Sequence, residues 1–425
     1  MRPFPNRSWI VALACALAAC GGSSGPVGAA LHRDLPALKL ELARAQQAGK
    51  LDRADVTDIA EAVVAREIHT ASGESGVRRV RAVRACARPV LGVLRERSSR
   101  TDEVAAEAML VRVTQNDVST SSLVKRYAAH GDGAWRAVAA RASVEPEDVL
   151  FRRRWFADPD RRVRRASLEA AMLTPEPGDL PALLETLRLD PDPLSRSLAA
   201  RAAGAIGGEH AVVALSDRLA RADEADRLAI VDALAMPAAF SAGGERELYR
   251  LAEDKHGVVS ISAARALLTH KPEDGALAGL LLTAIEHGSE EEQRLALSFV
   301  PLTDPRTPAT LDRAAVSSNP EVRVMALARL LALPARKAEA EKRLRQMAAK
   351  DDSVAEQARA ALAASGDRSV VAGLVRDLQR GHASSRQAAA VSLFRLGEPA
   401  KAATALGDDD PGVRLAVSCA VLAAR

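Results

Sequence analysis

Apolar residues recur along this chain with the spacing of a helix face, and the whole pattern returns about every 31 residues. A run that starts with Val-Arg and continues with Ala or Leu at helical spacing begins at Val163, Val322 and Val413, and a copy without the arginine begins at Val354. Degraded copies begin at Ser195, Asp226, Val259, Gln293 and Ser385. A fixed period of this length is typical of a solenoid, in which each short repeat packs on its neighbours. The pattern therefore predicts an all-α solenoid.

Each period contains two predicted helices that differ in side-chain size. The first contains the repeated run and is rich in alanine, so neighbouring first helices can approach closely. The second has bulkier residues at the same spacing, as in Leu180, Leu184 and Leu187. In several repeats an Asp-Pro or Asn-Pro pair separates the second helix from the next first helix, at Asp158, Asp190, Asn319 and Asp410. We expect the Asp or Asn of these pairs to cap the start of the first helix.

These repeats resemble HEAT repeats, in the short form found in phycobilisome-lyase-type proteins, over roughly residues 70–425. The resemblance implies an α-solenoid of about 10 to 12 helix pairs, and it leaves function open because many unrelated proteins use this fold. It also implies that an Asp and an Arg six residues later form a ladder between neighbouring units. Several units lack this pair. The units that keep it have Asp158 and Arg164, Asp190 and Arg196, and Asp408 and Arg414.

The N-terminal residues indicate export. Arg2 and Arg7 precede an apolar stretch at 9–17, which is shorter than the roughly 20 residues that span a bilayer. The run Leu-Ala-Ala-Cys-Gly that follows resembles a bacterial lipobox, which implies that Cys20 becomes lipid-modified and forms the new N-terminus. The alternative is an ordinary secretory signal that contains a cysteine.

This interpretation divides the chain into four segments. Residues 1–19 are a lipoprotein signal peptide, and residues 20–30 are a flexible Gly/Ser-rich tether with the lipid on Cys20. Residues 31–70 form a helical N-terminal cap, because solenoids need atypical end repeats, and residues 71–425 form the repeats. Gly21 stands where an inner-membrane retention signal of enterobacteria has Asp. By that resemblance, the periplasmic face of the outer membrane is favoured over the inner membrane.

Cysteine usage and net charge restrict the function further. Cys86 and Cys419 lie near opposite ends of the predicted solenoid, so we expect two buried thiols and no disulfide between them. The net charge of +4 includes two arginines of the signal peptide, so the exported chain is close to neutral. Phosphate binding needs a sustained basic surface, and the charge therefore argues against a nucleic-acid partner.

One segment, residues 126–165, combines aromatic and arginine residues and is the candidate partner-binding site. Such residues are common in binding hot spots and in anion recognition. HEAT-type second helices usually line the concave side, so part of this cluster would face a groove. The alternative is that the aromatics fill the core and the arginines form ladders and solvated faces. The candidate binding residues are Trp135, Arg136, Phe151, Arg152, Arg153, Arg154 and Trp155.

The sequence contains no recognisable catalytic or metal-binding motif. It has no His-Glu dipeptide of the kind through which some HEAT-repeat enzymes bind iron, no Gly-x-Ser-x-Gly and no Gly-rich phosphate loop. We therefore predict a lipid-anchored scaffold that binds an envelope protein along its groove, without catalysis, metal or cofactor. Two alternatives stay open. One is a chromophore-lyase-like HEAT-repeat enzyme, and the other is a binder of an anionic ligand or nucleic acid through residues 126–165.

Overall fold

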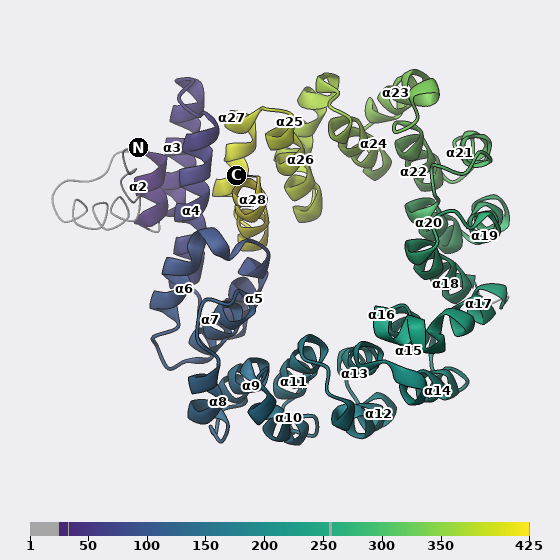
Figure 1. Ribbon diagram of the computed structural model, residues 1–425. Helices are drawn as coiled ribbons and strands as arrows, with labels where there is room; N and C mark the ends of the chain where they lie inside the picture. Colours follow the sequence, from purple (N-terminus) through teal and green to yellow (C-terminus); the bar gives the residue numbers. More distant parts are fainter. Residues whose placement is uncertain (1–24, 33, 255–256, 425) are drawn as a thin grey trace, which may run out of the picture. The chain divides into compact units, whose positions relative to one another are not determined.

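The computed structural model describes residues 25–32, 34–254 and 257–424 (Figure 1). The regular secondary structure of these ranges is helical throughout and includes no strand, which confirms the predicted all-α fold. The chain divides into two compact units of packed helices. We call Ser98–Ser365 the central unit, and Met1–Arg97 together with Gly366–Arg425 the terminal unit.

In the central unit, first and second helices alternate along the chain as the repeat predicts. The first helices are α7 (Glu103–Thr114), α9 (Gly133–Ala142), α11 (Arg161–Leu173), α13 (Pro193–Ile206), α15 (Glu224–Leu234), α18 (Gly257–His270), α20 (Glu290–Phe299), α22 (Pro320–Leu330) and α24 (Ser353–Ala364). The second helices are α8 (Ser121–Tyr127), α10 (Val149–Trp155), α12 (Leu180–Leu189), α14 (Gly208–Leu219), α17 (Glu245–Glu253), α19 (Gly275–His287), α21 (Thr307–Ala314) and α23 (Pro334–Ala348). A short helix, α16 (Pro237–Ala239), precedes α17.

The first helices form the inner layer of the curved central unit and the second helices form its outer layer (Figure 1). Side-chain size explains this curvature. Fully buried alanines such as Ala140, Ala170 and Ala199 separate neighbouring first helices. At Gly204 of α13, an added Cβ would lie only 2.3 Å from the carbonyl oxygen of Ala233 in α15. Helices in the Ala-rich layer are closer together than those in the Leu-rich layer, so the unit bends toward the first helices. The expectation that second helices line the concave side is therefore wrong for this unit.

Aspartate residues begin the first helices, although not always at the predicted position. Asp160 and Asp192 cap α11 and α13, where their carboxylates accept hydrogen bonds from backbone N–H groups of the first turn. The sequence placed these caps two residues earlier, at Asp158 and Asp190. The carboxylates of both residues instead accept hydrogen bonds from arginines of the preceding repeat. Asn319 caps α22 as predicted.

The terminal unit contains the two ends of the described chain. Its N-terminal helices are α2 (Pro26–Leu31), α3 (Leu35–Gln47), α4 (Arg53–His69), α5 (Gly73–Ala82), η1 (Val83–Cys86), η2 (Arg88–Val90) and α6 (Leu91–Arg97). Its C-terminal helices are η6 (Arg368–Val370), α25 (Val371–Arg380), α26 (Ala383–Arg395), α27 (Pro399–Ala402), η7 (Ala403–Gly407) and α28 (Pro411–Ala423). Helix α4 packs against α28, so the predicted N-terminal cap contacts the last repeat.

Two expectations about the ends of the chain are wrong. The predicted tether, residues 20–30, contains helix α2, in which Ala29 and Ala30 are buried against α3 and α4. Pro26 at the first position of α2 favours this helix. Cys86 and Cys419 form a disulfide with a Cα–Cα distance of 5.0 Å, because the packing of α28 against α4 and η1 brings them together. Cys20 and the predicted signal peptide lie outside the described residues.

Within the described ranges, no single helix is long and apolar enough to cross a bilayer. The segments Glu224–Leu234 and Pro237–Glu253 meet the criteria of length and composition only when they are taken together, and they are bent by 75°.

Candidate functional site

Three of the predicted binding residues lie in the core. Trp135 is 4% exposed, Trp155 is 6% exposed and Arg152 is fully buried. Trp135 of α9 stacks on Tyr127 of α8, with 4.6 Å between the ring centroids. These side chains hold helix pairs together and present no surface to a partner. The expectation that they face a groove is wrong, because the aromatic rings fill the wider space between α8, α9 and α10.

Arg152 and Arg153 share one buried carboxylate. Arg152 donates from Nε and Nη2 to Oδ2 of Asp179, at 3.1 and 2.5 Å, and Arg153 donates from Nε to Oδ1 at 2.7 Å. Nη1 of Arg152 also donates to the hydroxyl of Thr174 at 2.7 Å. Asp179 is fully buried and begins the next second helix, α12. The two arginines therefore link consecutive repeats, and only Arg153, whose side chain is 33% exposed, also reaches solvent.

Arg136 belongs to the ladder that the HEAT resemblance implies. It donates from Nε and Nη2 to the two carboxylate oxygens of Asp158 in the next repeat, at 3.0 and 2.9 Å. These hydrogen bonds raise the pKa of Arg136. Arg164 repeats the contact with Asp190, at 2.6 and 2.9 Å, while its Nη1 donates to the carbonyl oxygen of Asp158, six residues earlier. The predicted ladder is thus confirmed for these units, with the carboxylate partner in the following repeat.

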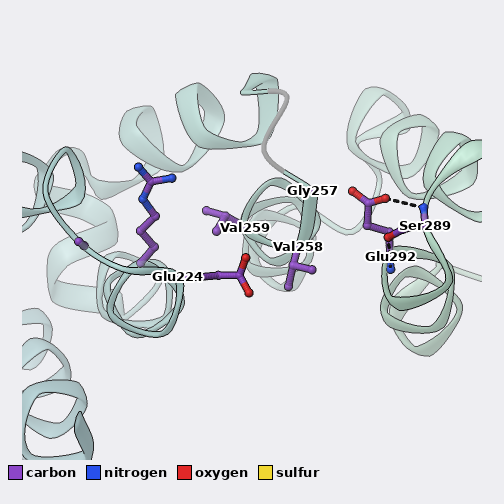
Figure 2. A pocket seen from close by; sticks show the side chains of 8 residues that line it. Glu224, Gly257, Val258, Val259, Ser289 and Glu292 are labelled. Carbon is purple, nitrogen blue, oxygen red and sulfur yellow. Dashed lines mark hydrogen bonds between the residues drawn. The ribbon is translucent and has the colours of Figure 1, made fainter. Parts of the chain in front are cut away.

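The ladder changes at a cleft of about 450 Å³ between the starts of α15, α18 and α20 (Figure 2). Arg196 still pairs with Asp226 at 2.9 Å. Arg227 occupies the ladder position of the next repeat and lines the cleft, but no described residue accepts a hydrogen bond from its side chain. Glu292 on the far wall is turned toward the backbone N–H of Ser289, 2.6 Å away (Figure 2). Among the described residues, Arg227 therefore makes no ladder contact with the following repeat.

Phe151 and Arg154 are the predicted binding residues that remain on the surface. Phe151 is 44% exposed, Arg154 is exposed, and the neighbouring Leu150 is 67% exposed. All three lie on α10, in the outer layer of the central unit (Figure 1). A role for Phe151 and Arg154 in partner binding stays a prediction, and it now concerns the outer layer.

A groove that the sequence analysis missed lies in the same layer, between α12 and α14, with a volume of about 620 Å³. The residues that line each wall follow the spacing i, i+3, i+4 and i+7, which places them on one helix face. At 1.5 Å per residue, each wall is about 10 Å long. One end is apolar, with Pro181, Leu184 and Ala214. The other end is basic, with Arg188, Arg218 and Arg221, and acidic residues stand between them at Glu185 and Asp217.

Two arginines at the basic end of this groove have free guanidinium groups. Arg188 lies in the last turn of α12 and Arg221 lies two residues after the end of α14, and both are exposed. Neither side chain has a hydrogen-bond or ion-pair partner within the part of the chain that the structure describes. Arg218 differs because it pairs with Asp226 at 3.1 Å. The sequence gives little sign of this site, because an arginine in the last turn of a helix commonly serves only to complement the helix dipole.

Comparison with known proteins adds little to this description. No family model matches the chain, and no curated protein matches it. Among solved structures, it is similar to the complex of CpcE and CpcF of phycocyanin lyase from Nostoc sp. PCC7120. The two are 19% identical over 53% of this chain and 93% of that chain, with a TM-score of 0.32. Values this low have no bearing on function. Within the described ranges, His, Cys, Asp and Glu side chains form no group suited to a metal ion.

Proposed function

We propose that this protein is an exported, lipid-anchored scaffold that binds a protein partner through the outer face of α12 and α14. The observation that carries the proposal is the groove with an apolar end and, at the other end, Arg188 and Arg221, whose guanidinium groups have no partner among the described residues. The remaining surface arginines near the predicted site are largely engaged within the chain. Arg164 binds Asp190 and Arg165 binds Asp192, which leaves few charges there for a phosphate backbone.

The chemistry of the groove selects the kind of segment that fits it. An amphipathic helix or extended segment would place apolar side chains against Leu184 and Ala214 and carboxylates against Arg188 and Arg221. Guanidinium groups bind carboxylates bidentately, so such a segment gains orientation as well as affinity. We therefore propose an acidic, amphipathic segment of an envelope protein as the occupant. Phe151 and Arg154 of α10 would extend the same face.

The location of the protein is part of the proposal. The lipobox-like run that ends at Gly21 supports lipid attachment at Cys20, on the periplasmic face of the outer membrane. The Cys86–Cys419 disulfide supports export, because structural disulfides persist in oxidising compartments outside the cytosol. A lipid anchor would hold the central unit near membrane proteins, where a scaffold meets its partner at high effective concentration.

Site-specific crosslinking in the native host tests this proposal. A photo-crosslinking amino acid is placed at Glu185 or at Asp217, two exposed groove residues, and at Arg246 on α17 as a control. We expect the two groove positions to crosslink to the same envelope protein, and the control position not to. The captured protein is then purified so that its affinity can be measured, since capture alone does not establish binding at the groove.

Charge reversal distinguishes the groove from other surfaces. Arg188→Glu together with Arg221→Glu should weaken binding at least about tenfold, because the acidic segment then meets like charges. Arg246→Glu is the matched control, an arginine whose side chain is 84% exposed on another outer helix. Equal binding by all three proteins would exclude the groove. Tetrapyrrole absorbance in the purified protein, or substrate turnover without a partner, would instead support the chromophore-lyase-like alternative.

A further inference from the structure

Helix α28 contains the ladder arginine of the last described repeat. This residue, Arg414, makes both ladder contacts. Its Nη1 donates to the carbonyl oxygen of Asp408, six residues earlier, and its Nε and Nη2 donate to Oε1 of Glu67 in α4, at 2.9 and 2.6 Å. One repeat earlier, Arg386 donates from Nε and Nη2 to the two carboxylate oxygens of Asp408, whereas both donors of Arg414 share one oxygen of Glu67. A carboxylate of the N-terminal helix α4 thus takes the place of the next repeat's aspartate.

Other contacts continue this docking of the N-terminal helices on the last repeats. Lys39 of α3 pairs with Asp409 at 2.6 Å, and Nη2 of Arg53 donates to the carbonyl oxygen of Ala424 at 2.7 Å. The Arg53 guanidinium also lies over the ring of Phe394, 5.0 Å from its centroid. These exposed contacts are individually weak. Glu67 and Arg414 are buried, but they would regain water if the helices separated, and this hydration offsets part of their attraction.

The disulfide lies within this same contact. Cys86 ends η1 beside the N-terminal helices, Cys419 lies on α28, and 333 residues separate them in sequence. A covalent link of this kind keeps the two surfaces at high effective concentration however weak their other contacts are. The sulfurs are shielded, since the two cysteines are only 5% and 9% exposed. A reductant therefore reaches them only after local opening of α28 or η1.

We propose that the Cys86–Cys419 disulfide is a redox-operated latch that fixes the N-terminal helices on the last repeat. In the open, reduced chain each cysteine carries a thiol. A low-molecular-weight disulfide accepts two electrons from the cysteine pair and leaves as two thiols, while the bond between the two sulfurs forms and each cysteine gives up its proton. A low-molecular-weight dithiol reverses the reaction and leaves as its own cyclic disulfide. Oxidation holds α4 on α28, and reduction leaves only the ladder contact and the helix packing.

Hydrogen exchange of the full mature chain tests the latch. Amide exchange is followed by mass spectrometry in oxidised protein, in protein treated with dithiothreitol, and in the Cys86→Ser/Cys419→Ser variant. Thiol alkylation and peptide mass establish the state of the disulfide. We expect exchange in α4 and α28 to be at least tenfold faster in the last two samples than in oxidised protein. Exchange in α9 and α11 of the central unit should not change.

The ladder contact provides a second, independent variant. Glu67→Gln should change exchange in α28 less than twofold while the disulfide is intact, because the link holds the contact closed. In the reduced protein the same substitution should add to the acceleration. Exchange in α4 and α28 that stays within twofold after reduction would overturn the latch. Equal acceleration in α9 and α11 would also overturn it, because the disulfide would then act on global stability. If the Cys86→Ser/Cys419→Ser variant does not fold, the exchange rates of dithiothreitol-treated wild-type protein test the latch without it.

Discussion

At the scale of single residues, buried charge is used here to join repeats. Asp179 is fully buried and is bound by Arg152, also fully buried, and by Arg153. Both charges would be strongly disfavoured alone, so each depends on its partner. The same rule explains why the arginine-rich segment 126–165 exposes fewer arginines than its composition indicates. Composition predicts that arginines are present, but it does not predict which of them a later aspartate neutralises.

Removal of Arg152 should therefore be costly. Arg152→Leu leaves Asp179 buried with one arginine instead of two, and we expect a loss of about 3 kcal/mol in the free energy of unfolding of the central unit. Urea unfolding followed by tryptophan fluorescence reports on this region, because Trp155 lies on the same helix. Arg154→Leu on the same helix is the control and should change stability by less than about 0.5 kcal/mol, since Arg154 is exposed. Similar losses in the two variants would contradict the assigned burial.

Acid stability should depend on the contact between Arg165 and Asp192. Hydrogen bonds from Arg165 hold the pKa of Asp192 well below its usual value of 3.8. A carboxyl group whose pKa is lower in the folded than in the unfolded state stabilises the fold at pH values above its unfolded-state pKa. This contribution is lost as the pH falls below about 4. Asp192→Asn keeps a residue suited to the helix cap but removes the charge. Wild type should be more stable than Asp192→Asn at pH 7, and thermal unfolding at pH 3 should show a smaller difference. An unchanged difference would refute the role of this ion pair.

At the scale of helices, the local signals predict the elements well and their packing less well. Asp34 and Asp52 mark the starts of α3 and α4 as their caps, and Gly49 separates the two helices. Helix α2 was missed because its Gly- and Ser-rich surroundings suggested a tether. The burial of Ala29 and Ala30 comes from α3 and α4 and leaves no local pattern. The groove between α12 and α14 was missed because it depends on how consecutive repeats align, which the periodicity alone does not specify.

The space around two glycines, Gly204 in the central unit and Gly92 in the terminal unit, predicts opposite effects of substitution by alanine. Gly204→Ala should destabilise by about 1–3 kcal/mol, because the added Cβ meets the backbone of Ala233 at 2.3 Å and the helices cannot separate without loss of packing. Gly92→Ala in α6 should be neutral or stabilise by up to about 1 kcal/mol, because nothing lies within 4 Å of its added Cβ and alanine favours a helix. Thermal unfolding by circular dichroism measures both. Equal stability of the two variants would contradict the close approach of α13 and α15.

At the scale of the whole molecule, what the sequence could not predict is the association of the two ends of the chain. Each residue of that contact occupies a position that the repeat pattern explains without any contact between the two ends. Arg414 keeps the ladder spacing, and Cys86 and Cys419 occupy inward helix positions. Only the packing of α28 against α4 and η1 turns the two cysteines into a disulfide and Glu67 into a ladder acceptor. Contacts between residues far apart in sequence have no periodic signal, and a single sequence does not contain them.

The position of the molecule in the cell provides the last prediction. The lipobox-like run makes Cys20 the residue that would carry the lipid, and Cys15 would be removed with the signal peptide. Cys20→Ser should move the protein from the membrane fraction to the periplasmic fraction and abolish labelling by an alkyne fatty acid. Cys15→Ser should leave both unchanged, which controls for the loss of a cysteine. Even one acyl chain anchors a protein only weakly, and the Cys20→Ser variant would carry none. The shift should therefore be nearly complete. A Cys20→Ser protein that still incorporates the alkyne fatty acid would contradict lipid attachment at Cys20.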